Sequence, residues 1–365
     1  MSRELTMISK EKYQYYNFSD NRSVSEAKKI FEQRIEDATY IFNKHNENFV
    51  SRVCFICGEN DFTKLQKFHG TYEVTKCNVC ASESVNPVPC EEALKDYYNN
   101  GKCNLLLDEL LKARYKKESD FILDDRVKVV LELIAGMDKV DINLLEIGCS
   151  SGSFLSKLKH FIRKQFPDRK VFLAGIDIDA NAIQSSVDKD LDLTTANAEE
   201  YVKSAEVRYD IILHFELIEH LADPFSFMTH LYRLLKTDGV MFFSTPNADG
   251  LEMHASGYND FRLLAHSIFP PMHLNAFSVS NIGHFAMRSG FKVVEVTTPG
   301  RLDIDMLSLC NNELDHGLKK VSDLDNNTKG LIQYLVSFLV KTHNKSESFE
   351  IVQSLVNLKI HPILL

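Results

Sequence analysis

Residues 144–155 decide the fold and read Leu144-Leu-Glu-Ile-Gly-Cys-Ser-Ser-Gly-Ser-Phe-Leu155. An apolar run ends at Glu146 and Ile147, a loop containing Gly148 and Gly152 follows, and a helical pattern begins near Ser153. Glycines in such a turn let a ligand approach the backbone at the carboxyl edge of a sheet. The G-x-G-x-x-G pattern of dinucleotide sites is absent, and an acidic residue stands at the strand end instead. The stretch therefore predicts a strand, a ligand-binding loop and a helix, in that order.

Apolar runs of strand length recur after this stretch, with helical patterns between them. They are residues 171–176, 211–215, 240–243 and 293–296. This alternation is typical of a parallel sheet with helices on both faces. The predicted fold class is therefore α/β, with a doubly wound Rossmann-like sheet, a small cysteine-containing module before it and helical extensions.

Length and charge narrow the function classes. A chain of 365 residues suggests two or three structural units. Lys plus Arg is 42 and Asp plus Glu is 51, so the net charge is −9. That balance argues against a general nucleic-acid binder, which needs a basic surface. No apolar run reaches about 20 residues and the N-terminus lacks the apolar core of a signal peptide, so we expect a cytoplasmic protein without membrane insertion.

Four of the eight cysteines form two C-x-x-C pairs: Cys54, Cys57, Cys77 and Cys80. The spacing C-x2-C-x19-C-x2-C lies within the range of four-cysteine zinc sites, in which two tight turns each direct two thiolates at one ion. Gly58 suits the left-handed position of the first turn, whereas Ala81 stands there in the second. We expect a structural Zn2+ in a zinc ribbon. Unconnected buried thiols and a redox pair are the alternatives, and Cys90 is near enough to be a substitute ligand.

The loop sequence resembles the first motif of class I S-adenosylmethionine-dependent methyltransferases, E/D-x-G-x-G-x-G. Glu146, Gly148 and Gly152 match that motif, and Ser150 stands where its middle glycine is usual. Further matches follow in the family's order at Asp177, at residues 197–198 and at residues 234–240. The resemblance implies a methyltransferase that binds S-adenosylmethionine.

The resemblance also implies which residues contact the cofactor. The carboxylate of Asp177, at the end of the next strand, can accept hydrogen bonds from both ribose hydroxyls. Asn197 and Ala198 stand where the family contacts the adenine ring. The implied set is Glu146, Gly148, Cys149, Ser150, Gly152, Asp177, Ile178, Asn197, Ala198 and Phe215.

The candidate catalytic residues follow the fourth predicted strand. Glu216, Glu219 and His220 are spaced i, i+3, i+4, which would put their side chains on one face of a helical turn. This E-x-x-E-H pattern resembles ubiquinone-pathway O-methyltransferases and small-RNA 2′-O-methyltransferases, where it carries a metal, and His273 stands where the RNA enzymes have a further ligand. Three readings stay open: a divalent cation such as Mg2+, a histidine base without metal, and a structural role. The candidate ligands of a cation are Glu216, Glu219, His220 and His273, and the candidate catalytic residues are Glu219, His220 and His273.

The predicted organisation has five parts. They are a helical N-terminal segment (1–50), the zinc ribbon (51–90), a helical connector (91–140), the methyltransferase domain (141–300) and a helical C-terminal extension (301–365) that offers a route to oligomers. A zinc ribbon before this domain resembles bacterial enzymes that modify sugars and cell-surface polysaccharides. Members that methylate carbon carry a larger C-terminal domain, which favours an oxygen acceptor here.

The leading hypothesis is therefore methyl transfer to a small-molecule or glycan acceptor, with O-methylation of a sugar or polysaccharide precursor preferred. The polar and aromatic segment 246–275 is expected to recognise that acceptor. Two alternatives remain, an RNA 2′-O-methyltransferase and a non-catalytic S-adenosylmethionine-binding scaffold. The acidic net charge disfavours a nucleic-acid partner.

Overall fold

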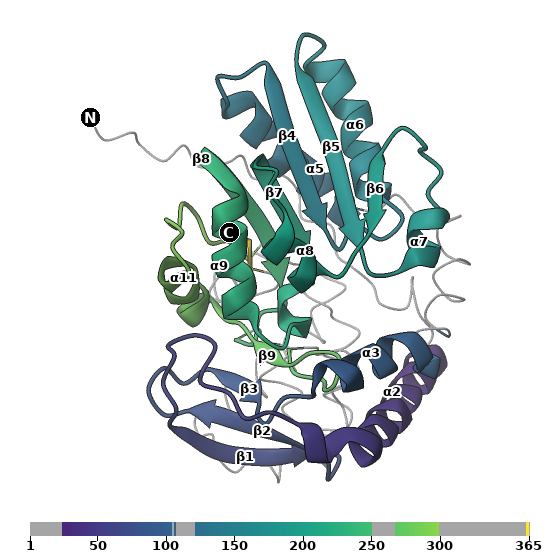
Figure 1. Cartoon of the computed structure of the whole chain (residues 1–365), viewed down its shortest axis with the longest axis vertical. Helices are drawn as coiled ribbons and strands as arrows, with labels where there is room; N and C mark the ends of the chain where they lie inside the picture. The colour runs from purple at the N-terminus through teal and green to yellow at the C-terminus, as the bar shows by residue number, and fades with distance from the viewer. Residues whose placement is uncertain (1–23, 104–105, 107–120, 250–266, 299–362, 365) are drawn as a thin grey trace, which may run out of the picture.

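The computed structural model describes residues 24–103, 106, 121–249, 267–298 and 363–364, and these form two β-sheets with flanking helices (Figure 1). The first 23 residues and nearly all of the C-terminal extension lie outside this range, so the helices expected there and the expected route to oligomers remain predictions. No helix in the described ranges is long and apolar enough to cross a bilayer.

The larger sheet has the strand order β10-β8-β7-β4-β5-β6. Its five parallel strands are β4 (Asp141–Ile147), β5 (Lys170–Asp177), β6 (Asp192–Thr195), β7 (Tyr209–Phe215) and β8 (Leu235–Thr245). The predicted parallel α/β sheet is thus confirmed. Residues 293–296, expected as a strand, form no strand, and the short β10 (Ile363–Leu364) pairs antiparallel with β8 instead.

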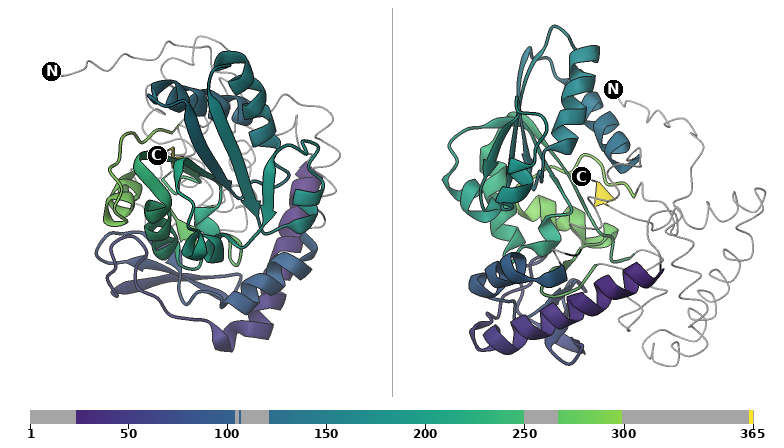
Figure 2. Two further views of the ribbon diagram at one scale, coloured as in Figure 1. Left: turned by 45° about the horizontal axis from the view of Figure 1, so that its top comes forward. Right: turned by 90° about the vertical axis from the view of Figure 1, so that its right-hand side faces the viewer.

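Strand β4 lies in the middle because both of its faces are apolar. Leu144 is buried in a core with α5 (Phe121–Gly136) and α6 (Ser153–Gln165), whereas Leu145 is buried in a second core. That second core includes α8 (Ala198–Ser204), α9 (Pro224–Leu234) and α11 (Val279–Arg288). Helices therefore cover both faces of the sheet, as Figures 1 and 2 show. The short helix α7 (Ala180–Gln184) follows β5.

The smaller sheet is antiparallel and has the order β1-β2-β3-β9. Strands β1 (Phe62–Phe68), β2 (Tyr72–Cys77) and β3 (Glu83–Val85) come from the cysteine-containing segment. The fourth strand, β9 (Asn275–Ala276), comes from the segment after β8 and pairs with β3. Part of the segment expected to recognise the acceptor is therefore built into the N-terminal sheet.

Helices α2 (Val24–His45) and α3 (Glu91–Asn100) lie side by side next to the smaller sheet (Figure 1). Two short 3-10 helices complete the elements, η1 (Asn46–Asn48) and η2 (Ile218–His220), the second of which follows β7. Apolar side chains of the N-terminal half, Phe55 and Ile56, are buried in the same core as Leu145 and Phe285. The first cysteine turn is therefore packed into the core of the large sheet, whereas Tyr72 and Val74 of the small sheet lie in a separate core.

The buried carboxylate of Asp210 in β7 holds together residues in and beside the parallel strands. It accepts hydrogen bonds from Lys139 Nζ and Lys236 Nζ, both at 2.7 Å, and from the Asn143 amide. Burial opposes its ionisation, but these donors outweigh burial and hold the pKa of Asp210 below its usual value. The stabilisation is therefore present above the pKa of an unfolded Asp and is lost as the pH falls through the lower native pKa.

We predict that Asp210→Asn lowers the free energy of unfolding by about 2 kcal/mol at pH 7, because two lysines lose their buried partner. The difference from the native protein should shrink at acid pH. Urea denaturation at both pH values measures it. Asp190→Asn is the matched control, because that carboxylate is 76% exposed and forms a surface ion pair with Lys159. Equal effects of the two substitutions would contradict the prediction.

Candidate functional site

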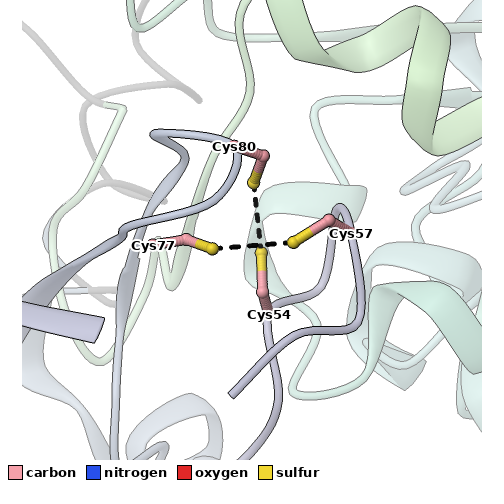
Figure 3. Close-up of side chains that lie close together, drawn as sticks. All are labelled: Cys54, Cys57, Cys77 and Cys80. Carbon is pink, nitrogen blue, oxygen red and sulfur yellow. Dashed lines mark hydrogen bonds between the residues drawn. The ribbon is translucent and has the colours of Figure 1, made fainter. Parts of the chain in front are cut away.

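The four cysteines of the two C-x-x-C pairs converge on one point (Figure 3). All four Sγ atoms lie within 4.8 Å of one another, and the Cys54–Cys80 and Cys57–Cys77 sulfurs are each 3.5 Å apart. A tetrahedral Zn2+ with bonds of about 2.3 Å would place its sulfur ligands about 3.8 Å apart. The cluster therefore has the dimensions of a zinc site.

Two similar turns present these sulfurs. The amide of Gly58 donates to the Cys54 carbonyl at 2.8 Å, and the amide of Ala81 donates to the Cys77 carbonyl at 2.9 Å. Both residues are left-handed, with φ of 84° and 58°. At the first position a Cβ on Gly58 would lie 2.8 Å from Nη2 of Arg288, so a side chain there would require the guanidinium to move.

Hydrogen bonding favours a thiolate at one of the four cysteines. Burial opposes ionisation of Cys54, but the Ser82 hydroxyl and nearby backbone amides outweigh burial and lower its pKa to about 7. Burial raises the pKa of Cys57 and of Cys80, so a cation is needed to hold all four as thiolates. The donor set and its spacing fit Zn2+.

A second group of residues forms the loop after β4, at the carboxyl edge of the large sheet. Gly148, Ser150 and Gly152 all have left-handed backbones, with φ of 79°, 51° and 74°. Ser150 thus takes a conformation that suits glycine and costs another residue about 1 kcal/mol.

The two glycines of this loop have different surroundings. A Cβ on Gly152 would lie 2.9 Å from Leu193 Cδ1, so this glycine permits close packing. A Cβ on Gly148 would lie 3.7 Å from Leu217 Cδ1, which is an ordinary contact, so a methyl group there meets no clash within the protein. Of the two, Gly148 is the one placed to let a ligand approach.

Asp177 at the end of β5 lies against this loop. Its Oδ2 accepts a hydrogen bond from the Ser150 amide at 2.7 Å, and its Oδ1 accepts one from the Asp179 amide at 2.9 Å. These bonds fix the orientation of the carboxylate, and each oxygen keeps a lone pair for a further donor. The next residue, Ile178, is 50% exposed and offers an apolar surface beside the carboxylate.

Glu146, at the end of β4, is buried, and its hydrogen bonding is incomplete. Its Oε2 has no hydrogen-bond partner among the described residues. Burial and the negative charge of Asp177 raise the pKa of Glu146 to about 8, although Arg126 opposes the shift. A buried carboxyl group with an unused acceptor suits a positively charged ligand, and S-adenosylmethionine carries both a sulfonium and an ammonium group.

The remaining expected cofactor contacts occupy several environments. Asn197 caps α8, because its Oδ1 accepts a hydrogen bond from the Glu200 amide, and its amide nitrogen can still act as a donor. Ala198 is the first residue of that helix. The side chain of Cys149 is buried, and its sulfur occupies the space beside Gly175. Phe215 lies at the end of β7 under the guanidinium of Arg126, 4.3 Å from the ring centre.

A third group gathers around η2, directly after β7. One donor atom each from Glu219, His220 and His273 lies within 4.8 Å of the other two, and the two imidazole rings are 4.6 Å apart. Glu219 is 1% exposed; its Oε2 accepts from Thr245 Oγ1 at 2.9 Å. Its Oε1 has no hydrogen-bond partner in the described part of the chain and lies 3.8 Å from His220 Nε2.

Glu216 lies apart from this cluster, unlike the arrangement that its i, i+3, i+4 spacing suggests. Its backbone is left-handed, with φ of 49°, so residues 216–220 do not form a continuous helical turn. Its Oε1 instead accepts hydrogen bonds from Ser244 Oγ at 2.7 Å and from Arg126 Nη2 at 3.2 Å. The structure thus brings together three of the four candidate ligands.

Two residues of this edge were absent from the sequence prediction. Tyr98 of α3 lies with its hydroxyl 3.2 Å from His220 Nδ1, which directs the other ring nitrogen towards Glu219. Arg126 comes from α5 and contacts Phe215 and Glu216. Both residues precede the methyltransferase motifs in the chain and carry no motif of their own, so only the fold places them here.

The electrostatics of η2 follow from burial. Burial lowers the pKa of His220 to about 4, so its imidazole is neutral at pH 7. Burial and the charge of Glu216 raise the pKa of Glu219 well above its usual value. One carboxyl group and two imidazoles are a donor set that suits a divalent transition metal, whereas Mg2+ prefers oxygen ligands throughout.

We predict that the protein retains about one Zn2+ per chain and that Cys77→Ser releases it, because three thiolates bind the ion less tightly than four. The melting temperature should fall by about 10 °C or more. Cys90→Ser is the control, since Cys90 is not part of the cluster in the structure. Metal analysis and thermal denaturation measure both effects. Unchanged zinc content in Cys77→Ser would contradict the assignment.

Comparison with known proteins shows which family the large-sheet half of the chain resembles. The methyltransferase domain family matches residues 119–296. A ubiquinone biosynthesis O-methyltransferase of Cereibacter sphaeroides is 32% identical over 120 residues, covering 32% of this chain and 46% of the relative. A malonyl-[acyl-carrier protein] O-methyltransferase 1 of Ilyobacter polytropus is 31% identical over 120 residues, covering 32% of this chain and 42% of the relative.

The chain therefore spans less than half the length of these curated relatives. Among solved structures, a SAM-dependent methyltransferase from Archaeoglobus fulgidus aligns with a TM-score of 0.43 and 17% identity, over 70% of this chain and 97% of that one. The motif loop, the parallel sheet and the family match over residues 119–296 agree. The chain contains a methyltransferase domain of the class I S-adenosylmethionine-dependent type.

Proposed function

We propose that the chain transfers the methyl group of S-adenosylmethionine to an oxygen atom of a small-molecule acceptor. The observation that carries the proposal is the position of η2 beside the loop after β4. Leu217, which precedes η2, lies 3.7 Å from the position of a Cβ on Gly148, so the loop and the Glu219–His220–His273 cluster are neighbours at one sheet edge. A cofactor site next to a group of proton acceptors is what methyl transfer to a hydroxyl requires.

The cofactor role of the loop follows from its free acceptors. Asp177 keeps a lone pair on each oxygen, which suits the two ribose hydroxyls. Asn197 and Ala198 would border the adenine, with the exposed Ile178 against its ring. Glu146 would satisfy its unused Oε2 near the charged methionine portion.

The chemistry is an in-line displacement at the methyl carbon. The acceptor oxygen donates a lone pair to form the new C–O bond while the C–S bond breaks, and the sulfonium leaves as a neutral thioether. The acceptor proton must pass to a base, because a neutral hydroxyl is a poor nucleophile. His220 is the assigned base: it is 22% exposed, and Tyr98 fixes its ring with Nε2 towards the cluster.

A divalent transition metal held by Glu219, His220 and His273 is the alternative reading of this cluster, in which His220 would be a ligand and not the base. The Oε1 of buried Glu219, which has no hydrogen-bond partner among the described residues, and the two adjacent imidazoles form a suitable donor set. When bound, such a cation would lower the pKa of an acceptor hydroxyl. Tyr98 and Thr245 would then orient two of its ligands through hydrogen bonds.

A sugar or polysaccharide precursor is the finer proposal for the acceptor. It rests on the zinc ribbon that precedes the methyltransferase domain, an order that resembles sugar-modifying enzymes. An RNA acceptor is the second candidate, because of the E-x-x-E-H pattern with a downstream histidine. The net charge of −9 disfavours RNA, and Arg52 of the ribbon donates to four internal oxygens rather than facing a partner.

The two loop glycines give a matched pair of variants for the cofactor site. Both have a left-handed backbone, so alanine adds a similar strain of about 1 kcal/mol at each. We predict that Gly148→Ala weakens S-adenosylmethionine binding by about tenfold or more, because the added methyl group would hinder the approach of the ligand to the loop backbone. Gly152→Ala should lower stability more, because its methyl group meets Leu193. Calorimetric titration and thermal denaturation compare them, and the opposite ranking would refute the assignment.

The function itself is tested by incubating the protein with methyl-labelled cofactor and separate panels of nucleotide sugars, hydroxylated aromatic compounds and RNA. We expect label in a hydroxyl-bearing small molecule. His220→Ala should lower kcat by about a hundredfold, as expected for loss of a general base, while cofactor affinity stays within threefold, about 0.7 kcal/mol. Label only in RNA would support the second candidate. Cofactor binding without transfer to any panel would favour a scaffold.

A further inference from the structure

A chain of hydrogen bonds connects η2 to the cysteine module, the segment 51–90 that contains the four clustered cysteines. Arg52, which precedes the first cysteine pair, donates from Nη2 to Oδ1 of Asn275 at 2.6 Å and from Nη1 to the carbonyl of Ala222 at 2.7 Å. Asn275 in turn donates from Nδ2 to the carbonyls of Leu221 at 2.8 Å and Glu219 at 3.3 Å. The same two side chains therefore contact the module on one side and the turn after β7 on the other.

Asn275 has its position fixed by the small sheet. It belongs to β9, pairs with Ser84 of β3 and is 1% exposed. The preceding residue, Leu274, donates its amide to the Glu219 carbonyl at 2.8 Å and accepts from the Val85 amide at 2.9 Å. Residues 274–275 thus run between the module and η2 and bond to both.

The 3-10 helix η2 needs such external partners. It has three residues, and no side chain caps its start. A single turn of 3-10 helix has few hydrogen bonds of its own and does not hold its shape alone. Carbonyl groups at 219, 221 and 222 all find their donors on Arg52, Leu274 or Asn275. The conformation of η2 is therefore imposed from the module side.

Arg52 suits this role better than a lysine would. Its guanidinium also reaches the carbonyls of Val85 and Leu274, both at 3.3 Å, so one planar group serves four oxygens on separate segments. Burial lowers the pKa of Arg52 to about 10, which still leaves it charged at neutral pH. A lysine has a single nitrogen and cannot match this fork.

We propose that Arg52 and Asn275 are positioning residues that clamp η2, and with it Glu219 and His220, onto the cysteine module. That Glu219 and His220 matter for activity rests on the proposed function. That Arg52 and Asn275 hold η2 in place does not depend on it. The module then has a second role besides its own fold, because it sets the geometry of the turn beside the cofactor loop.

Hydrogen–deuterium exchange of the full-length protein tests the clamp without any acceptor. Asn275→Asp keeps the acceptor for Arg52 but removes the donor to the η2 carbonyls. We expect exchange in peptides covering residues 216–222 to accelerate about tenfold, while the β1–β2 hairpin is unchanged. Arg52→Lys should act in the same direction and serves if Asn275→Asp fails to fold. Zinc content should stay the same in both variants.

Asn281→Asp is the matched control, because Asn281, in the first turn of α11, accepts from the Ser278 amide through its side-chain oxygen and makes no hydrogen bond to η2 within the described ranges. It should leave exchange at residues 216–222 as in the native protein. The proposal is overturned if Asn275→Asp and Arg52→Lys leave that exchange unchanged or accelerate exchange uniformly along the chain. Calorimetry with S-adenosylmethionine separates the two claims: absence of binding in the native protein refutes the proposed function, not the clamp.

Discussion

The parallel pairing of β4 with β5 on one side and β7 on the other is the constraint on which the site depends. Parallel strands end at the same edge, so residues far apart in the chain, Glu146, Asp177 and Phe215, meet there. The pairing is stabilised by apolar residues on both faces of β4. Everything that contacts a ligand can then be supplied by the short loops that follow these strands.

The cysteine module makes hydrogen bonds and apolar contacts with the methyltransferase half of the chain. Strand β9 returns from the methyltransferase half to complete the small sheet, and the two halves share a core around Phe55 and Phe285. The helix that follows the module, α3, brings Tyr98 within hydrogen-bonding distance of His220. Zinc binding, folding of the module and geometry of the turn after β7 are therefore expected to depend on one another.

Sequence patterns predicted the parallel sheet, the order of motifs and the convergence of the four cysteines, because each depends on local periodicity or spacing. They also paired Glu219 and His220, which are adjacent in the chain. They could not show that a left-handed backbone turns Glu216 away towards Arg126, nor that Asn275 bonds to η2, because both depend on tertiary contacts. The run at 293–296 has strand-like composition but forms no strand, which illustrates how context overrides β propensity.

A crystal structure with S-adenosylhomocysteine bound would test the central claim most directly, because it locates the cofactor relative to both groups of residues. The account predicts ribose hydroxyls within hydrogen-bonding distance of Asp177, the nucleoside beside Gly148 and the sulfur atom facing the Glu219–His220–His273 cluster. A nucleoside bound away from this sheet edge, or a sulfur atom directed away from the cluster, would contradict it.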